Sequence, residues 1–435
     1  MRRKLVHPGA GELHYEIRGI VEFAEAIRDT GLEIIWENIG DPIAKGEQVP
    51  AWIRDIVADE ARRDIAAYGY SPTKGLLAAR EFIAADRSKQ GTMLPAEHIL
   101  FFNGLGDAIN KIYTWLNPEA RVLGPNPAYP THSAVEAAHG RSAHLTYRLD
   151  PKNNWLPNVG DIRRQVKAHP EIAGLLIINP DNPTGVVYPR SLLEEFVAIA
   201  HEYRLFLIAD EVYANLTHDQ PSFVSLGALA AGVPTMIMRG LSKEVPWPGS
   251  RCGWLEFYNL EADPDFARYA KSIEEAKMTE VCSTTLPQAV LPAILGDPRY
   301  QTHLAARRRK YAARASEAVA VLSDSPTLDV VLPRGAFYLA VTFRDGALQR
   351  LTGRPAANPQ AQKLLDKALA DIPADNLDKR FCHQLLAATG ICVVPLTTGF
   401  NSTVPGFRMT LLESDDMAFS STLETIKAFC GLANR

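Results

Sequence analysis

The sequence predicts an α/β protein with two domains: a large one built on a mostly parallel sheet flanked by helices, and a smaller α+β one. Its 435 residues are too many for one hydrophobic core, since single cores stop growing near about 250–300 residues. Short apolar runs alternate with helical patterns through the middle of the chain, as in βαβ units. After about residue 300 this alternation ends, which indicates the second domain.

The apolar runs of the middle region are the predicted strands of the large domain. Runs this apolar are typical of strands that helices cover on both faces. Helical patterns such as 191–203 separate several of them. The runs cover residues 98–103, 120–125, 173–179, 204–210, 234–240 and 253–258.

The C-terminal region predicts the small domain. A charged helix is expected over 303–322, with the basic run Arg307-Arg308-Arg309-Lys310 on its solvated face. A last helix is expected to begin near Ser414-Asp415, which are typical N-cap residues. The polar segment 344–378 is interpreted as an inserted lid or surface element without chemistry of its own. The expected parts are residues 1–50 as an N-terminal arm and part of the small domain, 51–302 as the large domain and 303–435 as the small one.

The composition excludes several classes of protein. A net charge of −4 shows no bias toward nucleic acid or anionic membranes. Five cysteines without a CxxC pair fit a reducing compartment better than a disulfide framework. The first residues lack the apolar stretch of a secretory signal, and no run of about 18 apolar residues is present. The expectation is a cytoplasmic protein that binds no nucleic acid, membrane or metal.

Glycines follow the first predicted strand. Ligands of open α/β sheets bind at the carboxyl ends of the strands, where Gly104-Leu105-Gly106 stands before a helical pattern. Such glycines let backbone N–H groups face an anion at a helix N-terminus, although a tight turn gives the same pattern. A dinucleotide site needs an acidic residue about 20 residues further on, at the end of the next strand. That strand ends in Gly124-Pro125-Asn126-Pro127 instead, which disfavours a dinucleotide.

Polar residues lie at the ends of the predicted strands 173–179 and 204–210. Asn182 lies in a turn with two prolines and a glycine, which holds its amide as a fixed donor. Asp210 ends the following strand, where a buried carboxylate is costly unless it has a cationic partner; the alternative is a helix N-cap. Tyr213 follows one helical turn later.

The next strand end carries Ser242-Lys243, and Arg251 follows eight residues after the lysine. A lone lysine is usually a solvated surface charge. A lysine that follows an apolar strand inside a glycine-framed turn is less common. Two interpretations of Lys243 therefore remain: a solvated surface charge, or an amine nucleophile that the turn holds in place.

Taken as one site, these strand ends offer an amine, a carboxylate, an amide, a phenol, a guanidinium group and a helix N-terminus. This set complements pyridoxal 5′-phosphate. The aldehyde needs an amine to form a Schiff base, and the pyridine nitrogen stays protonated beside a buried carboxylate. The phenolic oxygen needs donors, and the dianionic phosphate needs arginine and backbone N–H groups.

Eight short motifs occur in order along the chain. They are Asn38-Ile39-Gly40-Asp41-Pro42, Tyr70 to Gly75, Asn103-Gly104, Pro127-Ala128-Tyr129-Pro130, Asn179 to Gly185, Asp210 to Tyr213, Ser242-Lys243 with Arg251, and Gly406-Phe407-Arg408. Through them nearly the whole chain resembles the fold-type I, class I and II aminotransferases. The resemblance implies an aspartate aminotransferase-like fold with a mostly parallel seven-stranded sheet, and a homodimer with shared active sites.

The same resemblance implies how a cofactor is held. Lys243 forms the Schiff base and moves a proton between substrate and cofactor, and Asp210 pairs with the pyridinium nitrogen. Asn182 and Tyr213 hydrogen-bond the ring oxygen, and Tyr129 stacks on the ring. The phosphate contacts are Gly104, Leu105, Gly106, Ser242, Arg251 and, in the neighbouring subunit's site, Tyr70.

The resemblance also implies the substrate contacts. Arg408 clamps the substrate α-carboxylate in a bidentate pair, with Asn182 and the Gly40 backbone nearby. Arg18 is either a contact for the distal carboxylate of glutamate or a structural arginine at the start of the first helix. Thr284 and Thr285 are expected near the dimer interface.

The segments 14–27, 36–42 and 240–243 resemble the alanine (glutamate–pyruvate) aminotransferase branch. Gly240 stands where many relatives carry a hydroxyl residue, which removes one phosphate contact. The expected reaction moves an amino group between an L-amino acid, alanine or glutamate above all, and a 2-oxo acid such as 2-oxoglutarate or pyruvate. A carbon–sulfur lyase, a cyclopropane-forming synthase and an aspartate or aromatic aminotransferase remain alternatives. A non-catalytic regulator is disfavoured, since no helix-turn-helix pattern precedes the motifs.

Overall fold

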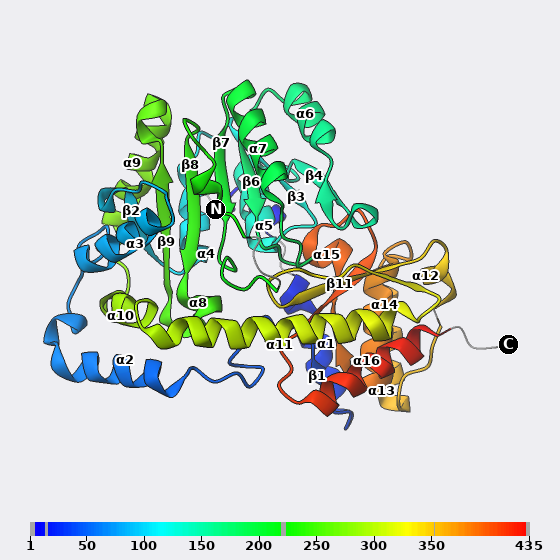
Figure 1. Cartoon of the computed structure of the whole chain (residues 1–435). Helices are drawn as coiled ribbons and strands as arrows, with labels where there is room; N and C mark the ends of the chain where they lie inside the picture. The colour runs from blue at the N-terminus through cyan, green and yellow to red at the C-terminus, as the bar shows by residue number, and fades with distance from the viewer. Residues whose placement is uncertain (1–4, 14–15, 219–222, 352, 432–435) are drawn as a thin grey trace.

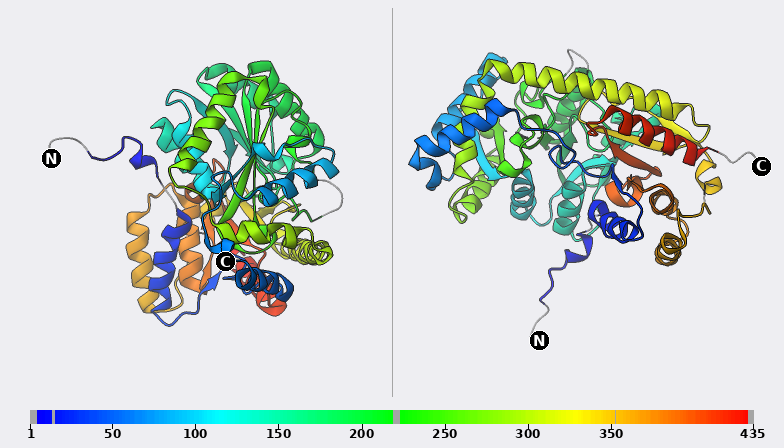
Figure 2. Two further views of the ribbon diagram at one scale, coloured as in Figure 1. Left: turned by 90° about the vertical axis from the view of Figure 1, so that its left-hand side faces the viewer. Right: turned by 90° about the horizontal axis from the view of Figure 1, so that it is seen from below.

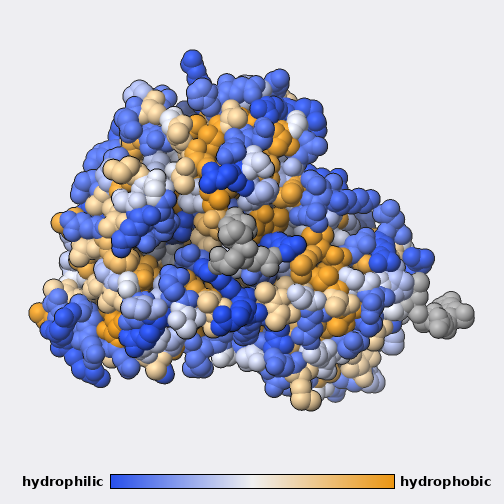
Figure 3. Space-filling model, viewed as in Figure 1, coloured by the Kyte–Doolittle hydropathy of each residue, from blue (hydrophilic) through white to orange (hydrophobic). Residues whose placement is uncertain are grey.

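The computed structural model describes residues 5–13, 16–218, 223–351 and 353–431. It has the predicted α/β architecture, with one large sheet and a smaller antiparallel one (Figure 1). The large sheet contains eight strands and the small one four. Two further strands, which are far apart in the sequence, pair with each other. The surface seen in Figure 3 is mainly hydrophilic, with separate apolar patches.

The large sheet has the strand order β2-β9-β8-β7-β6-β3-β4-β5. Strands β8, β7, β6, β3 and β4 run parallel, β9 is antiparallel to both its neighbours, and β5 is antiparallel to β4. The bounds are β2 Ile99–Asn103, β3 Arg121–Asn126, β4 Thr146–Asp150, β5 Leu156–Pro157, β6 Ile172–Ile178, β7 Phe206–Asp210, β8 Thr235–Gly240 and β9 Cys252–Tyr258. The sheet thus has eight strands where seven were expected. None of the six predicted apolar runs covers β4 or β5, because β4 is buried only at alternate residues and β5 has two residues.

Helices cover both faces of this sheet, which explains why its strands are apolar throughout (Figure 2). One face packs on α4 and α9, and the other on α3, α6, α7 and α10. The helices of this region are α2 Ala51–Arg63, α3 Leu77–Lys89, α4 Leu105–Trp115, α5 Pro130–Gly140, α6 Val159–Ala168, α7 Arg190–Tyr203, α8 Leu241–Glu244, α9 Pro264–Met278 and α10 Thr285–Leu295.

The smaller sheet has the antiparallel order β10-β11-β14-β13. Beside it, β1 pairs in parallel with β12, so the first and last parts of the chain meet. The strands are β1 Ile35–Trp36, β10 Leu328–Val330, β11 Tyr338–Phe343, β12 Ile391–Cys392, β13 Val394–Pro395 and β14 Gly406–Thr410. The helices are α1 Glu16–Arg28, α11 Pro298–Ser323, α12 Ala347–Arg350, α13 Pro359–Asp371, α14 Leu377–Thr389, α15 Leu396–Phe400 and α16 Asp416–Cys430.

The segment 344–378 contains α12 and α13. Helix α13 packs against α14 and α1, and its Ala361 and Leu365 are buried. Helix α16 begins as expected, because the Asp415 side chain caps it by accepting a hydrogen bond from the Ala418 N–H at 2.8 Å.

The expectation of a solvated face for the basic run on α11 was wrong for Arg307, although Arg309 in the same run is exposed. The Arg307 side chain is only 7% exposed, because α11 lies along both sheets (Figure 1). Its guanidinium group donates to the carbonyls of Lys243 and Glu244 at 2.5 and 3.0 Å, and to the carboxylate of Glu47 at 2.8 Å. Arg308 also turns inward and donates to the Asn215 carbonyl at 2.7 Å.

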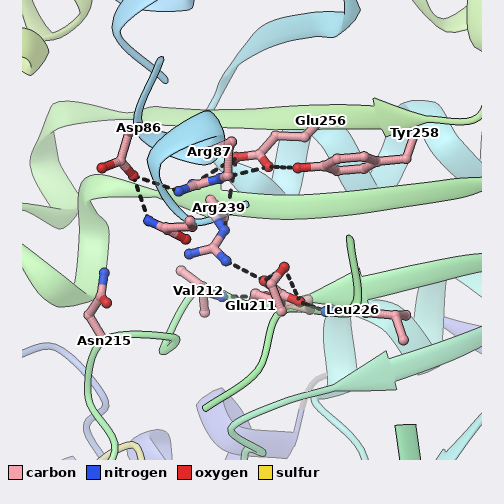
Figure 4. Close-up of polar contacts among 12 residues, drawn as sticks. Asp86, Arg87, Glu211, Val212, Asn215, Leu226, Arg239, Glu256 and Tyr258 are labelled. Atoms are coloured by element: carbon pink, nitrogen blue, oxygen red, sulfur yellow. Dashed lines mark hydrogen bonds and ion pairs between the residues drawn. The ribbon is translucent and has the colours of Figure 1, made fainter. Parts of the chain in front are cut away.

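A buried ion network joins α3 to strands β8 and β9 (Figure 4). The Glu256 carboxylate accepts from Arg87 at 2.9 Å and from the Tyr258 hydroxyl at 2.8 Å, and Arg239 pairs with Glu211 beside it. Burial works to raise the pKa of Glu256, but Arg87 and Arg239 outweigh it and lower the pKa to about 2. Glu256 is therefore ionised, with its charge fully compensated inside the protein.

Replacing Glu256 by Gln should lower the free energy of unfolding by about 3–5 kcal/mol, because it removes the buried counter-charge of Arg87, whose remaining partner Asp86 is partly exposed. Urea unfolding followed by circular dichroism measures the change. The matched control is Glu202→Gln, whose ion pair with Arg163 is 3.1 Å long but partly exposed on both sides. Its effect should stay below about 1 kcal/mol, and an equal loss in the two variants would contradict the compensated-charge account.

Candidate active site

The predicted site residues from three different strands come together at one edge of the large sheet. Asn182 follows β6, Asp210 ends β7 and Lys243 follows β8, and these three strands are neighbours. Arg408, on β14 of the small sheet, donates to the Asn182 side chain at 3.5 Å. We call Asn182, Asp210, Lys243 and Arg408 the strand-end cluster.

Lys243 is half-buried and held by a long-range contact. Strand β8 ends at Gly240, and the single turn α8 then carries the lysine inward, where its Nζ donates to the Gly40 carbonyl at 2.7 Å. The ammonium group also lies 5.7 Å from the centre of the Phe337 ring. A solvated surface charge would not be held by a carbonyl 203 residues away in sequence, so the lysine is positioned.

Asp210 is a buried carboxylate, 4% exposed, at the end of its strand. One oxygen accepts from the Val212 N–H at 3.2 Å, within a turn rather than at the start of a helix. The other lies 3.3 Å from Nε2 of His132, a fully buried residue of α5. The buried neighbour of this carboxylate is therefore a histidine ring, which no motif had indicated.

Glycine at position 104 is required by the neighbouring arginine. Its φ is +81°, and a Cβ atom there would lie 2.3 Å from Nη2 of Arg251. That guanidinium group donates to the carbonyls of Asn103 and Pro248, both at 3.2 Å. Leu105 and Gly106 begin α4 beside it, and Ser242 is half-buried next to Lys243 in sequence. A helix N-terminus and an arginine thus lie together, as an anion site needs.

Arg408 is buried, with 2% of its surface exposed. Its guanidinium group donates to the Asn38 carbonyl and lies 4.6 Å from the centre of the Tyr338 ring and 5.2 Å from that of Phe400. A cation held between aromatic rings and beside an amide keeps a fixed orientation. This arrangement suits recognition of a carboxylate.

Tyr213 is also buried, and its hydroxyl lies 3.0 Å from that of Tyr338. Burial raises the pKa of Tyr213 well above its ordinary value, and the Tyr338 hydroxyl adds to the effect. The phenol therefore stays protonated and can donate a hydrogen bond. Tyr129 is half-buried and lies edge-on to His132, with ring centres 6.4 Å apart.

Two predicted residues are not brought into this cluster by the single chain. Tyr70 lies on the surface, 84% exposed, beside a cavity of about 510 Å³ that Thr284 and Thr285 also line. Arg18 belongs to α1, but its side chain lies outside the described residues.

A larger cavity, of about 990 Å³, lies at the opposite, amino ends of the strands. Phe206, Pro234 and Tyr269 are among its lining residues, and none of the eight motifs contributes to it. The chemistry of the side chains, rather than cavity size, therefore identifies the candidate site.

Asp181 is an ionisable group in the turn next to Asn182. It is fully buried, and one carboxylate oxygen accepts from the Thr184 N–H and hydroxyl at 3.0 and 2.5 Å. The other oxygen has no hydrogen-bond partner among the described residues. Burial, helped by the charge of Asp210, raises the pKa of Asp181 from 3.8 to about 7, although Thr184 works against the rise.

A carboxyl group whose pKa is raised on folding stabilises the protein below its unfolded pKa and loses that contribution as the pH rises through the folded pKa. Wild-type protein should therefore lose stability relative to Asp181→Asn between pH 4 and pH 7, by on the order of 4 kcal/mol. Urea unfolding at pH 5, 6 and 8 measures this difference. A difference that stays constant with pH would show that Asp181 is ionised throughout.

None of the helices that the structure describes is both long and apolar enough to cross a membrane.

Comparison with known proteins identifies the family. A family model described as "Aminotransferase class I and II" matches residues 36–418. The chain is 46% identical over 427 residues to an uncharacterized aminotransferase of Methanocaldococcus jannaschii, covering 98% of both chains. It is 31% identical over 330 residues to the glutamate-pyruvate aminotransferase AlaA of Escherichia coli K12, covering 75% of this chain and 79% of that one. A crystal structure of an aminotransferase from Escherichia coli superimposes with a TM-score of 0.82 at 26% identity, covering 98% of each chain. This chain belongs to the class I and II aminotransferases.

Proposed function

We propose that this aminotransferase uses pyridoxal 5′-phosphate to move an amino group between an L-amino acid and a 2-oxo acid. The leading substrates are alanine and glutamate with 2-oxoglutarate and pyruvate. The observation that carries the proposal is the strand-end cluster itself: an inward-facing amine, a buried carboxylate and an amide on three neighbouring strands, facing a buried arginine.

The residues fit the cofactor in charge and in space. The space that a side chain at Gly104 would fill is occupied by the Arg251 guanidinium group at the N-terminus of α4, which suits a phosphate. Asp210 offers a buried negative charge, as a protonated pyridine nitrogen requires. When bound, the cofactor supplies an aldehyde for an amine and a ring that withdraws electrons.

Lys243 is the proposed nucleophile and proton carrier. Its amine donates to the Gly40 carbonyl at 2.7 Å, and Arg307 holds the lysine's own carbonyl at 2.5 Å. The backbone is therefore fixed while the side chain can turn, as proton transfer between two nearby carbon atoms requires. Asp210 would keep a proton on the pyridine nitrogen, and His132, whose Nε2 lies 3.3 Å from the carboxylate, would orient Asp210.

The remaining cofactor contacts follow the strand ends. Asn182 and Tyr213 would donate to the ring oxygen, and Tyr129 would offer an aromatic face to the ring. The phosphate would be held by Gly104, Leu105, Gly106, Ser242 and Arg251.

Arg408 is the proposed clamp for the substrate α-carboxylate, with Asn182 and the Gly40 backbone beside it. Its forked donors match a carboxylate in a way that lysine cannot. A role of Arg18 toward a distal carboxylate remains a prediction from the sequence.

The relation to AlaA of Escherichia coli, a glutamate-pyruvate aminotransferase, supports alanine and glutamate as substrates. Aspartate or aromatic amino acids, and carbon–sulfur bond cleavage on the same fold, are the competing assignments. We further propose a cytoplasmic homodimer in which Tyr70 reaches the partner's phosphate site. Its exposure in the single chain, together with that of Ile65 and Tyr68, supports a partner on this surface.

Lys243→Ala should abolish pyruvate formation from L-alanine and 2-oxoglutarate, by at least about 10³-fold, since both the nucleophile and the proton carrier are lost. Pyruvate is followed with a lactate dehydrogenase couple. The control is Lys271→Ala, which removes an exposed lysine paired with Glu274 on α9. Pyruvate that forms only from a cysteine-type substrate, without an acceptor oxo acid, would instead indicate a lyase.

Arg408→Lys should raise the KM for both the amino acid and the oxo acid by about 10- to 100-fold, because a lysine keeps the charge but loses the bidentate bonds. Steady-state kinetics measures the change, with kcat less affected than KM. The control Arg344→Lys alters an exposed arginine paired with Asp329. An unchanged KM would remove Arg408 from the substrate site.

A further inference from the structure

Tyr338 is the residue at which the two sheets meet the candidate site. It begins β11 of the small sheet, and only 2% of it is exposed. Its hydroxyl lies 3.0 Å from the Tyr213 hydroxyl, which belongs to the turn after β7 of the large sheet. The two rings meet edge-on, with centres 5.8 Å apart and planes at 84°.

The ring of Tyr338 makes a second contact, with the guanidinium group of Arg408. The guanidinium carbon lies 4.6 Å from the ring centre. Strands β11 and β14 pair so that Tyr338 is opposite Thr410 and Ala340 is opposite Arg408, which fixes the two side chains relative to each other. The negative face of the aromatic ring attracts the cation and limits its orientations.

The third contact of Tyr338 is with the backbone at Gly40. A Cβ atom built at position 40 would lie 2.4 Å from the Tyr338 hydroxyl oxygen, so no larger residue fits there without movement. The carbonyl of the same glycine accepts the Lys243 ammonium group. The Tyr338 hydroxyl thus lies between the Gly40 backbone, whose carbonyl binds Lys243, and the phenol of Tyr213.

We propose that Tyr338 is a positioning residue that joins the two halves of the site: its hydroxyl orients Tyr213, and its ring orients Arg408. The inference rests on the proposed function, in which Tyr213 binds the cofactor and Arg408 the substrate. Either hydroxyl of this pair can donate to the other. With the cofactor bound, Tyr338 would donate to the Tyr213 oxygen, so that the Tyr213 hydrogen is left for the cofactor ring oxygen. Donation in a chain polarises the second donor and strengthens its bond.

The two contacts of Tyr338 can be separated by substitution. Tyr338→Phe removes only the hydroxyl. The pKa of the visible band of bound pyridoxal phosphate should then rise, because Tyr213 stabilises the ring oxyanion less well. Loss of one hydrogen bond corresponds to a rise of about 0.4–1 unit. The affinity for a carboxylate should stay the same, since the ring remains beneath Arg408.

Tyr338→Leu and Tyr338→Met remove the ring as well. The dissociation constant of 2-oxoglutarate should then rise about 2- to 30-fold, as expected for a lost cation–aromatic contact. Calorimetry measures it on the pyridoxal phosphate form, which has no amino group to give and so leaves the oxo acid unreacted. Spectrophotometric titration of the same samples gives the pKa of the visible band.

The matched control is Tyr147→Phe. Tyr147 is fully buried, its hydroxyl donates to the Leu176 carbonyl at 2.8 Å, and it lies in the core of the large domain. This variant loses a comparable buried hydrogen bond, so it should lose similar thermal stability without changing the visible band or the 2-oxoglutarate affinity. A merely structural Tyr338 would behave like this control.

The outcomes distinguish this proposal from the proposed function. Suppose that wild-type protein binds pyridoxal phosphate and transaminates. If Tyr338→Phe then leaves the pKa of the visible band unchanged, and Tyr338→Leu and Tyr338→Met leave the affinity for 2-oxoglutarate unchanged, the positioning role is overturned and the proposed function stands. If wild-type protein shows no visible band and no transamination, the proposed function fails and the role of Tyr338 falls with it.

Discussion

One buried guanidinium group, that of Arg307, binds the carbonyl groups of α8, the helical turn that carries Lys243. Arg307 reaches from α11 to the carbonyls of Lys243 and Glu244 and, with its other nitrogen, to Glu47 and the Tyr311 hydroxyl. Helix α8 is a single turn, so its carbonyls have few partners of their own. The arginine supplies partners and also fixes the turn to the segment that carries Gly40. The position of the amine is thereby set by the long helix that lies along both sheets.

The segment 35–47 is tied to the small domain as firmly as to the lysine. Its Glu37 carboxylate accepts from Lys45 at 3.1 Å and from the Thr410 hydroxyl at 2.8 Å, and Thr410 lies two residues beyond Arg408. Burial raises the pKa of Glu37, and Lys45 works against the rise. The Asn38 carbonyl accepts from Arg408 itself. Arg408 and Lys243 are thus joined through about ten residues near the start of the chain.

The sequence predicted most of the scaffold, because the sheet imposes a simple rule. Residues that follow neighbouring parallel strands meet at one edge, so the order of the apolar runs was enough to group Asn182, Asp210 and Lys243 in one site. Local patterns also predicted where α11 ends and where α16 begins. The two-residue strand β5 was not, because it leaves no hydrophobic periodicity.

The supporting residues were not predictable, because their contacts cross long stretches of chain. Tyr338 lies 125 residues from Tyr213 and looked like any aromatic residue of a strand. His132 follows a proline-rich motif without a signal that it faces Asp210. Arg307 belonged to a basic run that usually marks a solvated helix face, and only the path of α11 across both sheets buries it. Thus the candidate reactive groups could be named from the sequence, whereas the groups that contact them became visible only in three dimensions.

The pairing of β1 with β12 has a consequence for the order in which the protein is made. Ile35 and Trp36 emerge early from the ribosome, but their partners Ile391 and Cys392 are synthesised more than 350 residues later. The strands of the large sheet all lie between them and can associate first, since domains generally fold as units during synthesis. Until translation nears its end, the apolar residues of α1 and β1 have no surface to cover. The strand-end cluster is therefore completed last, because a nascent chain stopped short of β14 carries Lys243 without Arg408.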